Sequence, residues 1–410
     1  MKFYRNFSQI LTLNGAHKKE GRNLLPEDTG IIENATIITD QGKILWVGPD
    51  KDIPEEYADS LKSDDTEIIS GEGLSLTPEI VDSHTHLVFG GDRADEYAMR
   101  LNGADYQEIA NAGGGILSSM KATRNASEEE LFEIGKERVD LLVSHGIRTI
   151  EIKSGYGLDF DNEYKLSKVI DRLQKEFQAQ GIQIFRTFLA AHAVPKEFNS
   201  SNEYLKQVVL PLLDKVAVEN LVDFVDIFHE EGYFDLNDTK ELFQYAQNLG
   251  LKLKIHADEF QDNGGAEVAM EFKATSCDHL LKTNPKTASK FKESETVATI
   301  LPGTSMFLGK DFADVKSFLD SGAIVSFASD YNPGSCHAFN LLQLISTAAP
   351  KLKINQAQLW AGITLNASKA LGLRSQGAIA PGLNERFSIF KVDKVSKITY
   401  HWGKNFAVTC

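Results

Sequence analysis

The sequence predicts an α/β protein: a (β/α)8 TIM-type barrel with a small β-sandwich domain built from both chain ends. Eight apolar, β-branched runs fill the middle of the chain, and most are separated by segments with helical signals, as such a barrel requires. Short strands with turn residues between them occur before residue 76 and again near the C-terminus. We therefore expect residues 1–75 with 380–410 to form a composite β domain and residues 76–379 to form the barrel.

The terminal segments read as strands and tight turns. Residues 31–39 and 43–48 flank the turn Asp40-Gln41-Gly42, which predicts a hairpin. Further strands are expected at residues 387–392 and 398–402, after the boundary that Pro381-Gly382 marks. The two groups of strands lie at opposite ends of the chain and can pair to make one domain.

The middle of the chain supplies the expected barrel strands and helices. The strands are expected at residues 80–81, 147–152, 182–189, 222–228, 251–255, 274–277, 296–301 and 324–328. Ser127 and Glu130 have the spacing of a capping box before one helix. Residues 238–249 form another helical pattern, and Gly250 stands where a C-terminal cap glycine belongs. A doubly wound open sheet is the structural alternative.

Composition and charge limit the classes of partner. The 410 residues are 42% hydrophobic and 25% charged, which is typical of a globular chain with a large core. The net charge of −15 disfavours nucleic acid or anionic membrane as the main partner, although a small anionic substrate needs only a local cation. The three cysteines are too few for a disulfide framework, residues 1–9 lack the apolar stretch expected of a signal peptide, and no run of about 18 apolar residues occurs. We expect a soluble cytoplasmic protein.

Polar residues gather where the predicted strands end. In a barrel these carboxyl ends meet on one face, and active sites of this fold lie there. Most of the ten histidines belong to this group. The residues are His84, His86, Lys153, Tyr156, His192, His229, Glu230, His256, Glu259, His279, Asp330 and Asn332.

Four of these residues suit a metal ion. His84 and His86 are two positions apart, so on a strand they point the same way and can hold one ion between them. Taken alone, such a pair is more often two exposed strand histidines, and a lone His256 or Asp330 is more often structural. Their joint position after strands one, five and eight reverses that judgement. Three imidazoles and one carboxylate suit Zn²⁺ or Fe²⁺ with a coordination position left open.

Two further side chains are candidates for proton transfer. Glu259 follows His256 by three residues, and its alternative interpretation is an exposed loop carboxylate. His279 has a side chain whose usual pKa suits transfer near neutral pH. The run Gly113-Gly114-Gly115 follows a helical pattern, which disfavours a phosphate-binding loop. No nucleophile-elbow motif surrounds Ser335, which disfavours a serine hydrolase.

Together these segments resemble the amidohydrolase superfamily and, within it, the imidazolonepropionase family. The resemblance covers nearly the whole chain. Its most specific parts are EIKSGYGLD and SDYNPGS, together with Arg93 seven residues after His86. The segments that carry it are VDSHTHLVFGGDR (81–93), AGGGI (112–116), EIKSGYGLD (151–159), FLAAHAVP (188–195), KIHADEF (254–260), ATSCDHLL (274–281) and SDYNPGS (329–335).

The resemblance implies a barrel hydrolase that opens 4-imidazolone-5-propanoate, a small anionic substrate, to N-formimidoyl-L-glutamate in histidine degradation. It implies one zinc or iron ion per subunit, and a homodimer. The implied metal ligands are His84, His86, His256 and Asp330, and the implied catalytic residues are Glu259, His279 and Asp330. The implied substrate-binding residues are Arg93, Tyr156, His192, Glu259, Asn332, Gly334 and Ser335.

The sequence departs from the family pattern at several positions. Pro78-Glu79 stands where Pro-Gly is usual, the closing signature reads PGLNERFSIF, and His229 replaces a frequent cysteine. The first two departures concern the junction of the expected domains rather than catalysis. Strand four offers no lysine for a metal-bridging carbamate, which favours one metal over two. A nucleobase deaminase and a non-catalytic scaffold are the alternatives. A deaminase acts on a neutral base and needs no residue such as Arg93 to bind a carboxylate. A non-catalytic scaffold would be expected to have lost metal ligands.

Overall fold

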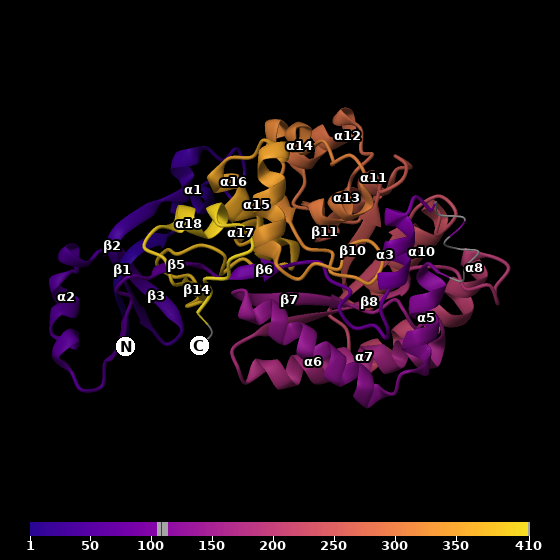
Figure 1. The fold of residues 1–410 in the computed structure, drawn as a ribbon, viewed down its shortest axis with the longest axis horizontal. Coiled ribbons are helices and arrows are strands. Elements are labelled where there is room, and N and C mark those ends of the chain that lie inside the picture. The colour runs from indigo at the N-terminus through magenta and orange to yellow at the C-terminus, as the bar shows by residue number, and fades with distance from the viewer. Residues whose placement is uncertain (105–107, 109–113, 409–410) are drawn as a thin grey trace.

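The protein places a small β sheet at one end and a barrel at the other (Figure 1). This computed structural model describes residues 1–104, 108 and 114–408. Both chain ends lie beside the small sheet, in the indigo and yellow parts of the ribbon. Cys410, and residues 112 and 113 of the AGGGI segment, lie outside the described residues.

The small sheet combines strands from both ends of the chain. Its order is β14-β5-β1-β2-β3, with β4 also paired to β1. The predicted hairpin is confirmed, since Asp40 pairs with Lys43 across the turn. The described strands form one mixed sheet where two packed sheets were expected, because the long β1 pairs with β2 along one edge and with β4 and β5 along the other. The strands are β1 Lys2–Leu11, β2 Ile31–Asp40, β3 Lys43–Pro49, β4 Glu67–Ser70, β5 Ser75–Pro78 and β14 Phe387–Phe390.

The extreme C-terminus differs from its prediction. Residues 398–402 were expected to form a strand, but α18 spans Val395–Tyr400. The prediction is wrong because Val395 and Ile398, three positions apart, both point into the core, and that spacing belongs to one face of a helix. The division into a composite domain of residues 1–75 with 380–410 and a barrel domain of residues 76–379 stays a prediction.

The barrel is confirmed. Its eight parallel strands follow the order of the chain, and each coincides with one of the eight predicted runs. A parallel bridge between Thr85 and Tyr331 joins the segments that follow the first and last strands. The sheet therefore closes at its carboxyl end, which excludes the open doubly wound alternative. The strands are β6 Ile80–Asp82, β7 Ile147–Lys153, β8 Gln183–Ala191, β9 Phe224–His229, β10 Lys252–Ala257, β11 Ser276–His279, β12 Val297–Ile300 and β13 Val325–Phe327.

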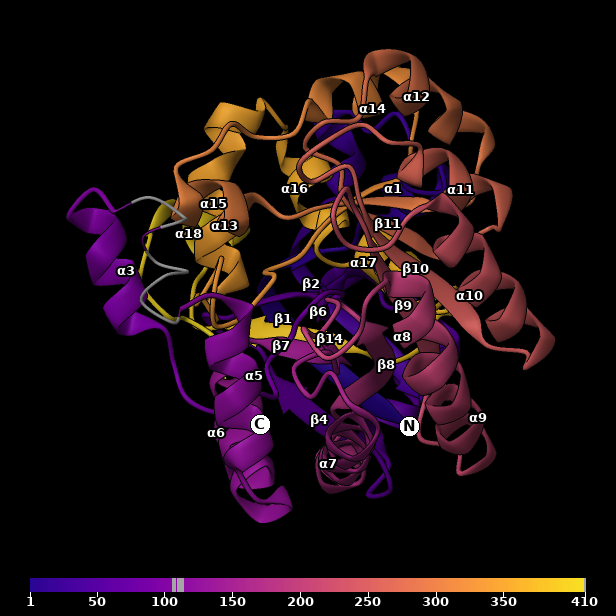
Figure 2. The ribbon, with the colours of Figure 1, turned by 90° about the vertical axis from the view of Figure 1, so that its right-hand side faces the viewer.

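Helices surround the barrel (Figure 2). The Ser127 capping box begins α6, and Asp235 caps α10 three residues before the predicted start. No described helix is long and apolar enough to cross a membrane. The helices of the barrel region are α3 Ala94–Leu101, α5 Ile116–Asn125, α6 Glu128–Ser144, α7 Phe160–Gln178, α8 Ser201–Tyr204, α9 Leu210–Val218, α10 Leu236–Asn248, α11 Gly265–Glu271, α12 Pro285–Lys290, α13 Pro302–Leu308, α14 Val315–Ser321, α15 Leu341–Leu352, α16 Gln356–Gly362 and α17 Leu365–Ala370; the short helices α1 Asn14–Lys18 and α2 Glu55–Ala58 lie near the small sheet.

Charged side chains fill part of the barrel interior. Glu151 and Lys153 are two positions apart in β7, and Lys254 and His256 are two positions apart in β10. The two side chains of each pair therefore point to the same side of their strand. These four residues are buried. The larger apolar core lies between the strands and the surrounding helices. The polar interior leads directly to the carboxyl ends of the strands, where the predicted site residues lie.

Two departures from the family pattern meet at the opposite end of the barrel. Glu79, fully buried before β6, accepts a hydrogen bond from Arg386 Nε at 2.5 Å, and Arg386 belongs to the divergent closing segment. Gln376 and Thr149 also donate to the Glu79 carboxylate. The two departures therefore form one ion pair. His229, the third departure, is buried and shares a hydrogen bond with Thr239.

Candidate active site

Three histidines converge at the carboxyl end of the barrel. His84 and His86 follow β6, and His256 lies in β10. The Nε2 atom of His86 is 3.2 Å from that of His84 and 3.3 Å from that of His256, and the three residues form the one candidate metal-binding group found among the described residues. Ligands held about 2.0–2.1 Å from one ion lie roughly 3–3.6 Å from each other, so the spacing fits a metal.

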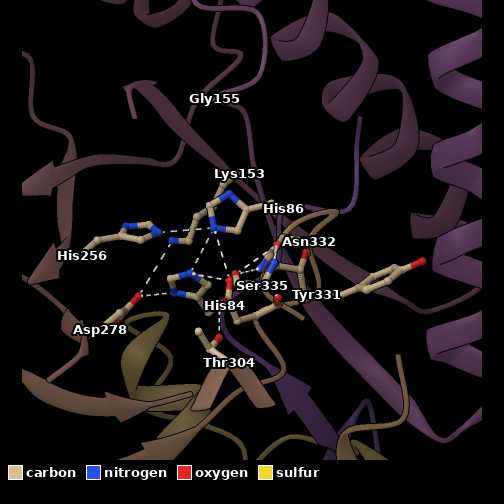
Figure 3. A network of polar contacts seen from close by, with 12 residues as sticks. His84, His86, Lys153, Gly155, His256, Asp278, Thr304, Tyr331, Asn332 and Ser335 are labelled. Atoms are coloured by element: carbon tan, nitrogen blue, oxygen red, sulfur yellow. Dashed lines mark hydrogen bonds and ion pairs between the residues drawn. The ribbon is translucent and has the colours of Figure 1, made fainter. Parts of the chain in front are cut away.

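Hydrogen bonds define which nitrogens face one another. His84 Nδ1 lies 2.7 Å from Asp278 Oδ2, and His256 Nδ1 lies 3.1 Å from Asp226 Oδ1. Each Nδ1–H donates to a carboxylate, so both Nε2 atoms carry lone pairs toward the shared centre (Figure 3). Burial lowers the pKa of His84 and His86 well below the usual value, which keeps both rings neutral. Facing lone pairs repel, and a cation between them converts that repulsion into coordination.

Asp330 directs one oxygen toward the same centre. Its Oδ1 lies 3.6 Å from Nε2 of both His84 and His86. Its Oδ2 accepts a hydrogen bond from Thr304 at 2.5 Å, which fixes the orientation of the carboxylate. Burial raises the pKa of Asp330, and this anion lacks a lysine or arginine partner among the described residues. The donor set of three imidazoles and a carboxylate suits zinc or iron.

Glu259 and His279 lie beside this group. Glu259 Oε2 is 3.6 Å from His279 Nδ1, and both residues are buried. Burial raises the pKa of Glu259 to about 7 and lowers that of His279 to about 4. Near neutral pH a carboxyl group with such a pKa both accepts and releases a proton readily. Glu230 accepts a hydrogen bond from the Phe260 N–H at 2.8 Å and so fixes the loop that carries Glu259.

Strained backbone positions several of these side chains. Asp258, His279 and Asp330 have φ of 54°, 82° and 52°, in the left-handed region that non-glycine residues rarely adopt. Each lies at the end of its strand or in the turn that follows it. The strain turns the chain sharply there, and such outliers are typical of functional sites.

The predicted substrate-binding residues line a single cavity. Its volume is about 980 Å³. Every predicted site residue except the deeply buried His84 contributes to its wall. Among the predicted residues, the wall contains His86, Arg93, Tyr156, His192, His256, Glu259, His279, Asp330, Asn332, Gly334 and Ser335.

Arg93 brings a cation into this wall. Its Nε donates to Glu96 Oε2 at 3.0 Å, and the other Glu96 oxygen accepts the Gly115 N–H. A Cβ at Gly334 would lie 1.8 Å from Arg93 Nη1, so a side chain at this position would displace the guanidinium from where it lies. The Glu96 contact uses the Nε edge of Arg93, and a guanidinium can bind a carboxylate through two parallel N–H groups.

His192 and Tyr156 offer neutral polar groups. His192 Nδ1 donates to the Gly155 carbonyl at 2.9 Å, and its ring stacks on His86. Burial lowers the pKa of His192 to about 3, so the ring is neutral. Burial also raises the pKa of Tyr156, so the side chain stays a phenol. A neutral acceptor and a phenolic donor suit the polar edge of an uncharged ring.

Asn332 and Ser335 are occupied within their own loop. The Asn332 amide donates to the Asp330 carbonyl and to Ser335 Oγ, and its oxygen accepts the N–H groups of Gly334 and Ser335. These contacts hold the segment 330–335 in the cavity wall. Their predicted contact with substrate stays a prediction.

Sequence reasoning missed the residues beneath the histidines. Asp226 and Asp278 lie inside strands β9 and β11, and Thr304 lies in helix α13. In the sequence Lys153 is a polar residue at a strand end and Lys254 belongs to the KIHADEF segment, and neither pattern indicates a role. Burial alone lowers the pKa of Lys153, but the charges of Asp226, Glu151 and Asp278 outweigh burial and raise it above the usual value.

A closed barrel with three histidines converging at its carboxyl end, and Asp330 beside them, is typical of the class of metal-dependent barrel hydrolases. Residues 75–409 match the amidohydrolase family. The chain is 37% identical over 407 residues to the imidazolonepropionase of Clostridium tetani, covering 99% of this chain and 95% of the relative. It is 40% identical over 403 residues to the imidazolonepropionase of Bacillus cereus, covering 97% and 92%. The chain therefore belongs to the amidohydrolase family and, within it, to the imidazolonepropionases.

A solved structure supports the fold independently. The zinc complex of atrazine chlorohydrolase TrzN from Arthrobacter aurescens superposes with a TM-score of 0.71, covering 99% of this chain and 93% of that one. Its sequence identity to this chain is 15%. At that identity the likeness concerns the fold alone.

Proposed function

We propose that this enzyme hydrolyses the ring amide C–N bond of 4-imidazolone-5-propanoate to N-formimidoyl-L-glutamate, a step of histidine degradation. The names of its relatives at 37–40% identity support this substrate. The observation that carries the proposal is the cluster of three histidine Nε2 atoms in a cavity whose wall also holds Arg93. The first feature suits a metal-assisted hydrolysis and the second suits a carboxylate-bearing substrate.

His84, His86, His256 and Asp330 would hold one zinc or iron ion per subunit. When bound, such an ion supplies Lewis-acid activation of water and of a carbonyl oxygen. Strand β9, Phe224–His229, contains no lysine that could bridge two metals as a carbamate. The residues present therefore fit a mononuclear site.

The cavity wall orients the substrate. Arg93 binds the propionate carboxylate through its N–H groups, which fixes one end of the molecule. Tyr156 and His192 hydrogen-bond the ring at the other end. Asn332, Gly334 and Ser335 shape the wall, and the missing side chain of Gly334 keeps the space that Arg93 occupies. This arrangement holds the ring carbonyl near the histidines.

Glu259 moves the proton that the reaction requires. Water adds to the ring carbonyl, and Glu259 accepts one proton from it. The bond between that carbon and the ring nitrogen then breaks, and Glu259 returns the proton to the departing nitrogen. His279 and Asp330 stabilise the charges that develop beside Glu259. One water is consumed, and the carbonyl becomes the carboxyl group of the product, which ionises to the carboxylate by releasing its proton to the solvent.

The test is direct turnover. Purified enzyme loaded with zinc or with iron is mixed with 4-imidazolone-5-propanoate, and loss of the ring is followed by ultraviolet absorbance while mass spectrometry identifies the product. We expect N-formimidoyl-L-glutamate to form only with metal present. Intact substrate in the presence of loaded enzyme, with deamination of cytosine or guanine instead, would establish the deaminase alternative.

Location and assembly follow from the same resemblance. We propose a cytoplasmic homodimer. Light scattering of the purified protein measures its mass, and twice the monomer mass of 45.4 kDa is expected.

A further inference from the structure

Two lysines lie inside the barrel beneath the candidate metal site. Lys153 ends β7 and Lys254 lies in β10, and neither side chain has any exposed surface. An ammonium group in such a position is strongly disfavoured unless anions surround it. Barrel interiors are ordinarily filled with branched apolar side chains. Two lysines in this position therefore need an explanation.

Each lysine contacts carboxylates that point into the same interior. Lys153 Nζ lies 2.7 Å from Glu151 Oε1, 2.7 Å from Asp226 Oδ2 and 3.9 Å from Asp278 Oδ2. Lys254 Nζ lies 3.6 Å from Asp278 Oδ2 and donates to the Ser83 carbonyl at 3.0 Å. Two ammonium groups thus bind three carboxylates contributed by three strands.

Two of those carboxylates hold metal-facing histidines. Asp226 binds Lys153 through Oδ2 and accepts the His256 Nδ1–H through Oδ1. Asp278 accepts the His84 Nδ1–H at 2.7 Å on the oxygen that faces both lysines (Figure 3). A continuous path of lysine, carboxylate and imidazole therefore ends at two of the three Nε2 atoms. The hydrogen bonds and ion pairs of the Glu151 carboxylate join it to Lys153, Lys254 and Thr187 rather than to a histidine.

We propose that Lys153 and Lys254 are positioning residues for the metal site, which act through Asp226 and Asp278 to hold His256 and His84 in the metal-binding orientation and so set the metal affinity. The proposal rests on the metal site of the proposed function and is independent of its substrate. Without the lysines the carboxylates lose their fixed positions, and the imidazoles that donate to them lose theirs. Groups that orient ligands in this way commonly change metal affinity by about 10–100-fold.

The test compares two buried cations at opposite ends of the barrel. Lys153→Met keeps the volume of the side chain and removes its charge, and Arg386→Met likewise leaves the buried carboxylate of Glu79 without its cation. Zinc Kd is measured on metal-free protein by competition with a chromophoric chelator. We expect the Kd to rise about 10–100-fold in Lys153→Met and to stay at the wild-type value in Arg386→Met. The visible spectrum of the cobalt-loaded protein should change in Lys153→Met alone.

A double variant tests whether the effect passes through Asp226. Asp226→Asn and Lys153→Met are combined, and the rise in Kd of the double variant is compared with the product of the two single effects. Residues on one path give less than that product, whereas independent contributions give the full product. The full product would overturn the assigned path.

The remaining outcomes separate this proposal from the proposed function. A wild-type Kd in Lys153→Met overturns the positioning role and leaves the metal site intact. Failure of the wild-type protein to bind zinc or iron overturns the metal site and this proposal together. If Lys153→Met does not fold by circular dichroism, Lys254→Met is measured instead. If neither lysine variant folds while Arg386→Met does, both lysines are structural and the proposal is overturned.

Discussion

Both ends of the barrel contain buried polar or charged groups, but the two ends differ in how far partners within the protein satisfy those groups. At the amino end, Glu79 receives hydrogen bonds from Arg386, Gln376 and Thr149, so its carboxylate is satisfied by the protein. At the carboxyl end, His84, His86 and His256 turn nitrogen atoms toward one another at 3.2 and 3.3 Å, and the carboxylates bound to Nδ1 of His84 and His256 leave the Nε2 atoms of those two rings as acceptors.

This difference separates a structural charge from a functional one. A buried carboxylate whose oxygens all have donors within the protein, as Glu79 has, needs no further ligand and acts in stability. A buried cluster whose acceptors face one another is incomplete without a cation. Two more atoms support this view, since His86 Nδ1 and His279 Nδ1 have no hydrogen-bond partner among the described residues. Substitutions at the two ends should therefore have different consequences.

The largest effect is expected at His256. His256→Ala deletes one of the four proposed protein ligands, so bound metal and activity should fall together, with kcat/KM lower by about 10³-fold or more, equivalent to roughly 4 kcal/mol. Metal analysis and turnover of the same preparation measure both. Full metal occupancy with normal turnover would show that His256 is not a ligand.

The next effect is expected at Glu259. Glu259→Gln keeps the size of the side chain but cannot accept a proton, so kcat should fall by about 10²–10⁴-fold while substrate and metal still bind. Steady-state kinetics and metal analysis check this. A wild-type kcat would transfer the base role to His279 or Asp330.

The pH profile sharpens the assignment to Glu259. Burial raises the pKa of Glu259 to about 7. The carboxylate is the basic form, so kcat/KM should decrease as the pH falls through this pKa. A bound divalent cation favours the carboxylate and moves that acidic limb to lower pH. Glu259→Gln should lack the limb, and an unchanged limb in that variant would assign it to another group.

A smaller effect is expected at Arg93. Arg93→Ala leaves the substrate carboxylate unpaired, which should cost about 2–5 kcal/mol, or roughly 30-fold to several thousand-fold in kcat/KM. Arg93→Lys should recover only part of the loss, because the lysine ammonium restores the charge but not the two parallel N–H groups of the guanidinium. Metal content should stay normal. The control is an imidazolone without the propionate: equal damage on both substrates would make Arg93 a structural residue.

The smallest effect on catalysis is expected at the amino end. Arg386→Met leaves the buried carboxylate of Glu79 without its cation, which should lower the free energy of unfolding by about 3–5 kcal/mol. Metal Kd and kcat/KM of the folded variant should stay within about twofold of wild type, because the pair lies far from the histidines. Urea unfolding and kinetics measure both quantities. A large loss of activity in folded protein would show that the charges at the amino end are not independent of the histidine cluster.

The sequence revealed the barrel and the converging residues because both depend on short-range patterns. Eight apolar runs marked the strands, and polar residues after seven of those runs marked the end where side chains meet. The spacing of His84 and His86 required no knowledge of the rest of the chain. His256 and Asp330 joined them through the rule that parallel strands end on one face.

The buried lysine network could not be found in this way. Strand β10, KLKIHA, alternates polar and apolar residues, which normally indicates one face in water. In this barrel the polar face of β10 points into the interior, and only the closed sheet shows that Lys254 meets Asp278 from the next strand. Contacts between strands depend on register, which a single sequence does not specify.

The pairing of β14 with β5 has a consequence for synthesis of the chain. Ile80 donates to Ser388 Oγ across 308 positions of sequence, and β5 pairs with β14 beside that contact. At about 5–20 residues per second, the ribosome needs roughly 15–60 s to make the intervening residues. During that time the edge of β5 has no partner strand on this side, and an open strand edge is a template for association between nascent chains. A chaperone that covers this edge until residue 390 emerges should therefore reduce association between nascent chains.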